Sequence, residues 1–261
     1  TVCPAHDDDN PSLSIGPGDN QPVVFFCHAG CETEEVLEAS GLTWDDISNE
    51  DWTPPDREDL RTPVGYASDV YSYHLPDGTL SYQVLRIPTP NGKRFMQRRP
   101  DDEGGWKYRL DDAVRVPYRL PQLIEAAQAG QVIHVAEGEK CVHALLAVIA
   151  EGEAATCNSG GAGKFREEYG HWFAGANVIV YADADEPGRD HAQHVREVLL
   201  EHGCTVKIVE PPPGLMPNGK RIGDVADHLE AGLPLDRMLE TTPESTEARA
   251  RTAVDVLDIV N

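Results

Sequence analysis

The chain has 261 residues, of which 40% are hydrophobic and 26% are charged, and this ordinary globular composition excludes a wholly disordered or low-complexity polymer. No apolar run approaches the roughly 20 residues that cross a bilayer, and Thr1 to Pro4 carry no signal region, so we expect a cytoplasmic protein without a membrane partner, cut from a longer chain. The net charge of −23, from 45 acidic and 22 basic residues, would repel a nucleic-acid backbone on average.

Four metal-binding side chains crowd into the first 31 residues, namely Cys3, His6, Cys27 and Cys31. They flank two predicted strands, 11–15 and 23–27, which a turn-rich string separates. Three thiolates and one imidazole suit tetrahedral zinc, and a site with four protein ligands is structural. The fourth ligand is the least certain, because His28 can replace one of the set. The alternative is a group of unrelated thiols beside a surface histidine.

Residues 33–40 are predicted to form a short helix that Thr33 caps and Gly41 ends. We assign residues 1–48 to this zinc-binding module. Residues 49–65 combine acidic residues and proline without periodicity, which is typical of a linker.

Residues 66–130 begin with alternating apolar and polar residues and turn signals at 76–78 and 90–92, a pattern that predicts an antiparallel meander. Between Arg86 and Arg119 this segment holds nine basic residues against five acidic ones, a net charge of +4. Such a strip is either a docking surface for a polyanion or a solvated strand face. The basic residues that we expect to contact nucleic acid are Lys93, Arg94, Arg98, Arg99, Lys107 and Arg109, with Phe95, Trp106 and Tyr108 as aromatic neighbours.

From residue 131 the pattern changes to short apolar strands that alternate with helices, which predicts a parallel sheet covered on both faces. The expected strands are 131–136, 154–157, 177–182 and 205–209, and the expected helices are 139–150, 164–174, 187–202 and 223–231. Cys141, Cys157 and Cys204 lie in these apolar segments and are expected in the core. We assign residues 131–232 to this α/β domain and 233–261 to a helical tail.

Acidic residues follow two of these strands. Glu137 ends the first, and Asp183 and Asp185 follow the third, where residues two apart in an extended segment point the same way. Carboxylates that converge in this manner repel one another and favour a hard divalent cation, magnesium or manganese. The alternative for Asp183 and Asp185 is helix capping.

The segment from Asn158 to Lys164 is a glycine-rich turn. It lacks the spacing and the hydroxyl of a phosphate-binding P-loop, because residue 158 is Asn and residue 165 is Phe. An ATPase is therefore not predicted. Lys164 either contacts a phosphate or the template backbone, or is a solvated lysine on a tight turn.

Several motifs together resemble a known family. Glu137-Gly-Glu-Lys140 and Asp183-Ala-Asp185-Glu-Pro-Gly188 resemble the Toprim domain of DnaG-type primases, topoisomerases and certain nucleases. Cys3-Pro-x-His6 with Cys27-His-Ala-Gly-Cys31 resembles the zinc ribbon of DnaG-type primases, particularly the phage and plasmid forms. The segment that ends in Val116-Pro-Tyr-Arg-Leu-Pro-Gln-Leu123 resembles the amino-terminal half of the primase core. The resemblance covers residues 1–232.

The resemblance implies a nucleotidyltransferase that makes short RNA primers on single-stranded DNA from nucleoside triphosphates, with a helicase, fused or separate, as partner. It implies that Asp183 and Asp185 ligate magnesium or manganese, that Glu137 is a ligand or assists proton transfer, and that Asp224 is a further ligand. Asp224 is equally suited to cap the helix at 223–231. Cys141 departs from the family, because many members have an aspartate at its position. The alternatives are a Toprim nuclease and a non-catalytic DNA-binding mediator similar to RecR.

Overall fold

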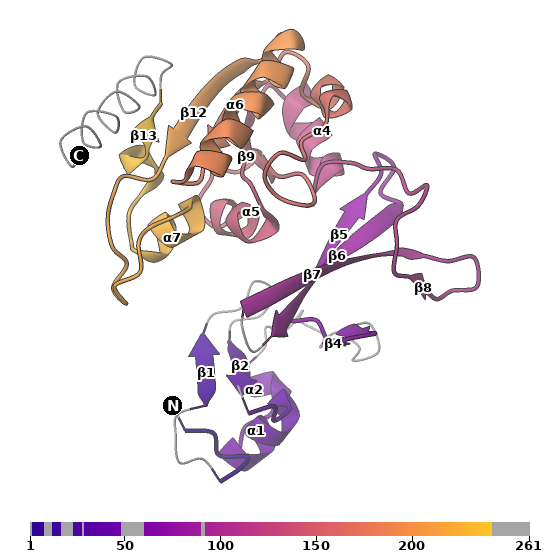
Figure 1. Ribbon diagram of the computed structural model, residues 1–261, viewed down its shortest axis with the longest axis vertical. Helices are drawn as coiled ribbons and strands as arrows, with labels where there is room; N and C mark the ends of the chain where they lie inside the picture. The colour runs from indigo at the N-terminus through magenta and orange to yellow at the C-terminus, as the bar shows by residue number, and fades with distance from the viewer. Residues whose placement is uncertain are drawn as a thin grey trace, which may run out of the picture. The chain divides into compact units, whose positions relative to one another are not determined.

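The computed structural model describes residues 2–7, 12–16, 23–27, 29–47, 60–89 and 92–241. The chain divides into two compact units, Thr1–Gly65 and Tyr66–Asn261 (Figure 1). The hydrophobic clusters of each unit are drawn from its own residues. Within the described ranges, no helix combines the length and the apolarity that a bilayer crossing requires.

The described part of the first unit begins with a β-hairpin and two short helices. Its elements are β1 (Leu13–Gly16), β2 (Val24–Cys27), α1 (Thr33–Ser40) and α2 (Trp44–Ile47). The strands are antiparallel, with Leu13 opposite Cys27, as predicted. Gly41 ends α1 in the left-handed conformation, also as predicted. The predicted cap was wrong, because Glu32 is the N-cap and closes a capping box with Glu35, while the Thr33 hydroxyl donates to the carbonyl of Phe25.

The expected linker, 49–65, lies mostly outside the described residues. Its last residues form a two-stranded hairpin of β3 (Arg61–Thr62) and β4 (Gly65–Tyr66). The Thr62 hydroxyl donates to the carbonyl of Gly65 across this turn. The end of the segment is therefore ordered by local backbone pairing.

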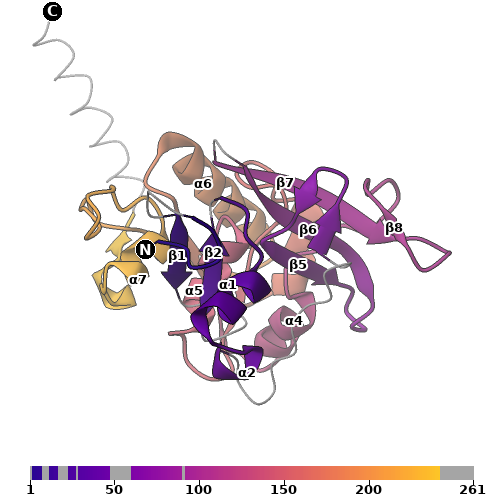
Figure 2. The same ribbon diagram turned by 90° about the horizontal axis from the view of Figure 1, so that it is seen from below.

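The second unit begins with the predicted antiparallel meander. Its strands are β5 (Asp69–His74), β6 (Leu80–Thr89), β7 (Gly92–Pro100) and β8 (Trp106–Lys107), in that order across the sheet. Figure 2 shows β5, β6 and β7 side by side. The expected turn at 76–78 is present, with Gly78 at a positive φ of 84°. The other expected turn falls partly outside the described residues.

A mixed sheet of five strands follows, in the order β10-β9-β11-β12-β13. The first four strands are parallel and match the predicted runs: β9 (Val132–Val135), β10 (Ala154–Thr156), β11 (Asn177–Tyr181) and β12 (Thr205–Glu210). The fifth strand, β13 (Leu239–Glu240), is antiparallel to β12 and was not predicted. It lies in the expected helical tail, of which residues 242–261 are outside the described part.

The connections of this sheet run in opposite directions from its centre. The helix α5 (Glu139–Leu146) connects β9 to β10 on one side, and α6 (Glu186–Glu201) connects β11 to β12 on the other. Right-handed crossovers in opposite directions place these helices on opposite faces of the sheet. The strand order therefore reverses between β9 and β11, and the crevice beyond the carboxyl ends of two such strands is a site where α/β sheets bind ligands.

The remaining helices are α4 (Leu120–Gln128), the 3₁₀ helices η1 (Glu167–Phe173) and η2 (Leu235–Arg237), and α7 (Val225–Glu230). Of these, α4 packs against β9 and β10, η1 packs against α4 and α6, and α7 packs against α5. The prediction of an α-helix over 164–174 was wrong, because this segment starts in the glycine-rich turn and forms only η1. The prediction that Cys141, Cys157 and Cys204 are buried is confirmed.

Candidate active site and metal centre

The four side chains of the first unit that were predicted to bind metal lie together. One ligand atom from each of Cys3, His6, Cys27 and Cys31 lies within 4.8 Å of all the others. The hairpin brings Cys27 beside His6, and the turn after β2 returns Cys31 to the same point. Nδ1 of His6 lies 3.1 Å from Sγ of Cys31 and 3.8 Å from Sγ of Cys27. His28 lies outside the described residues.

The electrostatics of this cluster fit a cation. Burial raises the pKa of Cys27, but hydrogen bonds from the backbone of Cys31 and from Ser12 outweigh it and lower that pKa to about 6. Burial and the neighbouring thiols Cys27 and Cys3 raise the pKa of Cys31 to about 12. Several thiolates cannot be held this close without a positive charge between them, and a divalent metal bound by these four residues would supply it. The Ser12 hydroxyl, 3.4 Å from Nε2 of His6, is suited to orient the ring.

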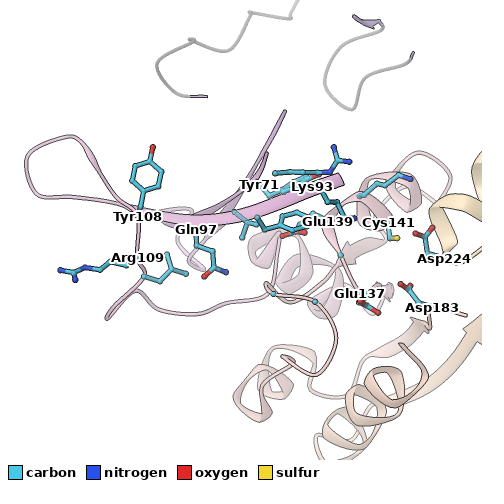
Figure 3. A pocket seen from close by; sticks show the side chains of 18 residues that line it. Tyr71, Lys93, Gln97, Tyr108, Arg109, Glu137, Glu139, Cys141, Asp183 and Asp224 are labelled. Carbon is cyan, nitrogen blue, oxygen red and sulfur yellow. The ribbon is translucent and has the colours of Figure 1, made fainter. Parts of the chain in front are cut away.

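The predicted carboxylates of the second unit meet at the reversal of strand order. Glu137 follows β9, Asp183 follows β11, and Asp224 is the N-cap of α7. All three line a cleft of about 610 Å³, a volume within the range of small-ligand sites. Figure 3 shows the carboxyl groups of Glu137 and Asp183 pointing toward one another, with Asp224 close by.

Burial and mutual repulsion raise the pKa values of two of these carboxyl groups. Burial, followed by the charges of Glu137, Asp224 and Asp185, raises the pKa of Asp183 to about 8. Burial and the charges of Asp185 and Asp224 also raise the pKa of Glu137. A divalent cation would relieve this repulsion, so the donor set fits a metal with oxygen ligands such as magnesium or manganese.

Asp185 belongs to the same electrostatic group but performs a second task. Its Oδ1 accepts a hydrogen bond of 2.8 Å from the backbone N–H of Gly188 and caps α6. A Cβ atom on Gly188 would lie 2.6 Å from Cβ of Asp183 and 3.0 Å from its backbone. Only glycine therefore allows the first turn of α6 to pack against Asp183. The carboxylate of Asp185 does not line the cleft. Asp224 likewise caps its helix, accepting from the N–H of Asp227.

The glycine-rich turn holds Glu137 in place. Gly160, Gly161 and Gly163 all have positive φ angles, between 71° and 91°, which bring the turn against the cleft wall. The backbone N–H of Ala162 donates to the Glu137 carboxylate, and the Cα of Gly161 is close enough that an added Cβ would lie 3.8 Å from Oε1 of Glu137. The turn is thus a backbone clamp on the first catalytic candidate.

Two buried side chains hold the clamp itself. Asn158 is 1% exposed, and its amide nitrogen donates to the Gly161 carbonyl at 2.8 Å. His191, on α6, accepts at Nδ1 from the N–H of Gly163 at 3.1 Å. Burial lowers the pKa of His191 to about 4, so its ring is neutral at pH 7 and able to accept. Lys164 is exposed and does not line the cleft.

The opposite wall of the cleft is one face of β6 and β7. Register pairs Val84 with Gln97 and Arg86 with Phe95, and alternation along the strand places Lys93, Phe95 and Gln97 on the cleft side. Figure 3 shows Lys93 beside the acidic end of the cleft, and Tyr108 and Arg109 at the other end. A negatively charged floor thus faces a positively charged wall.

The other basic residues of the strip that were predicted to contact nucleic acid do not line the cleft. Arg98 is 1% exposed, with its guanidinium 3.9 Å from the ring centre of Trp106 and its Nε donating to Gln83 at 2.8 Å. It is therefore out of reach of a ligand in solvent. Arg94 is exposed on the opposite face of β7, Arg99 pairs with Asp111 and Asp112, and Lys107 is half-buried.

Several cleft residues were not among the predicted site residues. Tyr71, Arg86, Gln97 and Glu139 all line it, and Glu139 accepts a hydrogen bond of 2.7 Å from the Tyr73 hydroxyl. Burial raises the pKa of Glu139. Alternation with Lys93 along the strand is the sequence signal that could have found Gln97, whereas Arg86 lines the cleft through a register that sets it opposite Phe95. Cys141 also lines the cleft, beside Asp183 and Asp224.

Comparison with known proteins finds neither a family model nor a curated protein that matches the chain. A search of solved structures finds DnaG-type primases. A DNA primase domain from Pseudomonas aeruginosa is 22% identical, with 55% of this chain and 49% of that chain covered and a TM-score of 0.33. A DnaG catalytic core is 19% identical, with coverages of 85% and 60% and a TM-score of 0.45.

The zinc-binding and RNA polymerase domains of the Aquifex aeolicus primase are 15% identical, with coverages of 99% and 82% and a TM-score of 0.49. The chain thus resembles DnaG-type primases, and it spans about half to three-fifths of the first two of these proteins. All three likenesses are below 25% identity and below a TM-score of 0.5, so a functional assignment has to rest on the geometry of the site.

Proposed function

We propose that this protein is a DNA-dependent RNA primase, with a zinc ribbon at Cys3, His6, Cys27 and Cys31 and a Toprim-type catalytic domain. The observation that carries the proposal is the meeting of Glu137, Asp183 and Asp224 in one cleft whose facing wall is basic. Oxygen ligands hold the metals of phosphoryl transfer, and the basic wall suits the phosphates of a nucleic acid.

The reaction is nucleotidyl transfer. A 3′-hydroxyl attacks the α-phosphate of a nucleoside triphosphate, a new phosphodiester bond forms, and pyrophosphate leaves with the electron pair of the broken bond. Asp183, Asp185 and Asp224 would hold magnesium or manganese, which when bound offsets the negative charge of the phosphates. Glu137, with its raised pKa, is suited to accept the proton of the hydroxyl or to serve as a further ligand.

The basic side chains would grip the template weakly and without sequence preference. Lys93 and Arg109 line the cleft, and we add Arg86 to them. Arg94, Arg99, Lys107 and Lys164 would extend the contact outside the cleft, whereas Arg98 is left out because it is buried. A primase that acts in cytoplasmic DNA replication would have a helicase, fused or separate, as its partner.

The test is synthesis on a single-stranded DNA template with labelled nucleoside triphosphates and magnesium or manganese. The wild type is compared with the Asp183→Asn, Asp185→Asn double variant and with Asp190→Asn, an exposed carboxylate on α6, as matched control. We expect new oligonucleotides, a loss of at least about a hundredfold in the double variant, and no loss in the control.

Two other outcomes would replace the proposal. Degradation of the template that depends on Asp183 and Asp185 indicates a Toprim nuclease. Tight binding of DNA with neither synthesis nor degradation indicates a mediator similar to RecR. Metal analysis of the wild type and of a Cys27→Ser variant tests the zinc separately, with one zinc ion per chain expected only in the wild type.

A further inference from the structure

The aromatic residues of the basic strip differ in what covers them. The guanidinium of Arg98 lies over the ring of Trp106 at 3.9 Å, so Arg98 covers one face of this ring. Phe95, in contrast, is 46% exposed although it lines the cleft. An apolar ring left half open to solvent inside a polar cleft has unused stacking surface.

Phe95 is also placed between the two charged regions of the cleft. It lies on β7 between Lys93 and Gln97, on the face that looks toward Glu137, Asp183 and Asp224. Lys93 Nζ lies over the Phe95 ring, 5.6 Å from its centre, and Lys93 lines the same cleft as the carboxylates (Figure 3). A cation therefore adjoins the ring on the side of the acidic cluster.

We propose that Phe95 is the stacking platform of a nucleobase subsite in this cleft. A nucleotide combines an anionic phosphate with an aromatic base. Its phosphate suits the region between Lys93 and the metal-binding carboxylates, and its base suits the exposed ring of Phe95. The inference rests on the proposed function, since it names the part of the substrate that this wall of the cleft receives.

The base can come from the template strand or from the incoming nucleotide, and two binding measurements separate these sources. The first uses a single-stranded oligodeoxythymidine that carries one 2-aminopurine. The second uses 2-aminopurine riboside triphosphate with manganese. Stacking quenches the fluorescence of 2-aminopurine, so each titration reports both affinity and stacking, and neither requires turnover.

Four variants complete the experiment: Phe95→Ala, Phe95→Leu, Phe95→Trp and Leu200→Ala. We expect Phe95→Ala and Phe95→Leu to weaken binding about 5- to 150-fold in at least one arm and to lose the quenching, because a stacked base contributes about 1–3 kcal/mol. Phe95→Trp should keep both signals. Leu200→Ala removes an exposed apolar side chain of α6 that does not line the cleft and should change nothing.

If Phe95→Ala keeps the wild-type affinity and quenching in both titrations, the subsite proposal is refuted. If Phe95→Leu behaves as the wild type does, the base does not bind there by aromatic stacking. Thermal unfolding of each variant shows that the fold is kept. The two proposals fail separately. If the wild type binds and quenches through Phe95 but makes no oligonucleotide, the subsite is supported and the primase proposal is refuted. If the protein makes primers and Phe95→Ala changes nothing, the primase proposal is supported and the subsite is refuted.

Discussion

At the residue scale, the acidic cluster costs stability until a cation neutralises it. The pKa of Asp183 is about 8 in the folded chain and about 3.9 in an unfolded one. The folded chain therefore binds this proton more tightly, and the free energy of unfolding falls as pH rises from about 4 to about 8. Above that range the full penalty of the charged carboxylate remains.

We predict that Asp183→Asn makes the metal-free protein more stable at pH 9 and changes little at pH 4. The expected gain is about 1–3 kcal/mol, which allows for the screening that a partly exposed carboxylate receives from solvent. Manganese should then stabilise the wild type and not the variant. Urea unfolding with a chelator and with manganese, at both pH values, measures these effects.

The matched control is Asp190→Asn, which removes an exposed carboxylate on α6, the helix that follows Asp183. It should leave the pH dependence and the response to manganese unchanged. A variant Asp183→Asn that is less stable than the wild type at pH 9 without metal would contradict the electrostatic account of the site.

The sequence locates these carboxylates but not their surroundings. Glu137 and Asp183 are predictable because each directly follows a buried strand, and parallel strands end at one edge of a sheet. The burial of Arg98 is not predictable, since it depends on the register that sets Arg98 against Trp106 and Gln83. Basic residues that are neighbours in the sequence belong to both faces of a strand, and the folded sheet places them on opposite sides.

At the scale of elements, the glycine-rich turn between β10 and η1 positions Glu137 through its backbone. Asn158 fixes the turn at the carbonyl of Gly161, next to the N–H of Ala162 that donates to Glu137. Loss of the Asn158 amide leaves the partly buried Gly161 carbonyl without this donor, which costs about 1–3 kcal/mol.

We predict that Asn158→Ala lowers the free energy of unfolding by about that amount and weakens manganese binding several-fold. Glu137 would lose its fixed position without losing its charge. Manganese titration followed by electron paramagnetic resonance measures the affinity. Asn177→Ala, which removes an exposed asparagine at the opposite end of β11, should bind manganese as the wild type does. Equal affinities in the two variants would refute the clamp.

The elements that the sequence predicts well are those with a continuous apolar run, such as β9 and β11, whose buried residues leave little choice of structure. The elements that it misses are held by tertiary contacts. The strand β13 has two residues and exists because it pairs with the edge of β12. The helix α4 begins at Leu120 after Arg119, which has a left-handed φ of 56° that no local pattern signals.

At the scale of the whole molecule, the two units have separate cores and therefore separate sources of stability. Among the described residues of the first unit, seven form its buried core, and two of these are the predicted ligands Cys3 and Cys27. So small a core supplies little stability without a metal, which contributes on the order of 10 kcal/mol in comparable modules. The second unit has a large core of its own.

We predict that a strong zinc chelator exposes the amides of α1 and β2 to hydrogen exchange while β9, β11 and α6 stay protected. The Cys31→Ser variant should reproduce this pattern without chelator. Mass spectrometry of exchange in the full chain gives the protection of each segment. Loss of protection in both units together, or in neither, would show that the metal does not stabilise the first unit independently.

The contact between Gly188 and Asp183 has a consequence for how this protein can vary. A side chain at position 188 would meet the Cβ atom and the backbone N and O of residue 183, atoms that are present whichever side chain other than glycine stands there. Exchange of the aspartate for another side chain would therefore not make room for a larger residue at position 188. A variant that removes only the acid can thus be compared with the wild type without a compensating change at the start of α6.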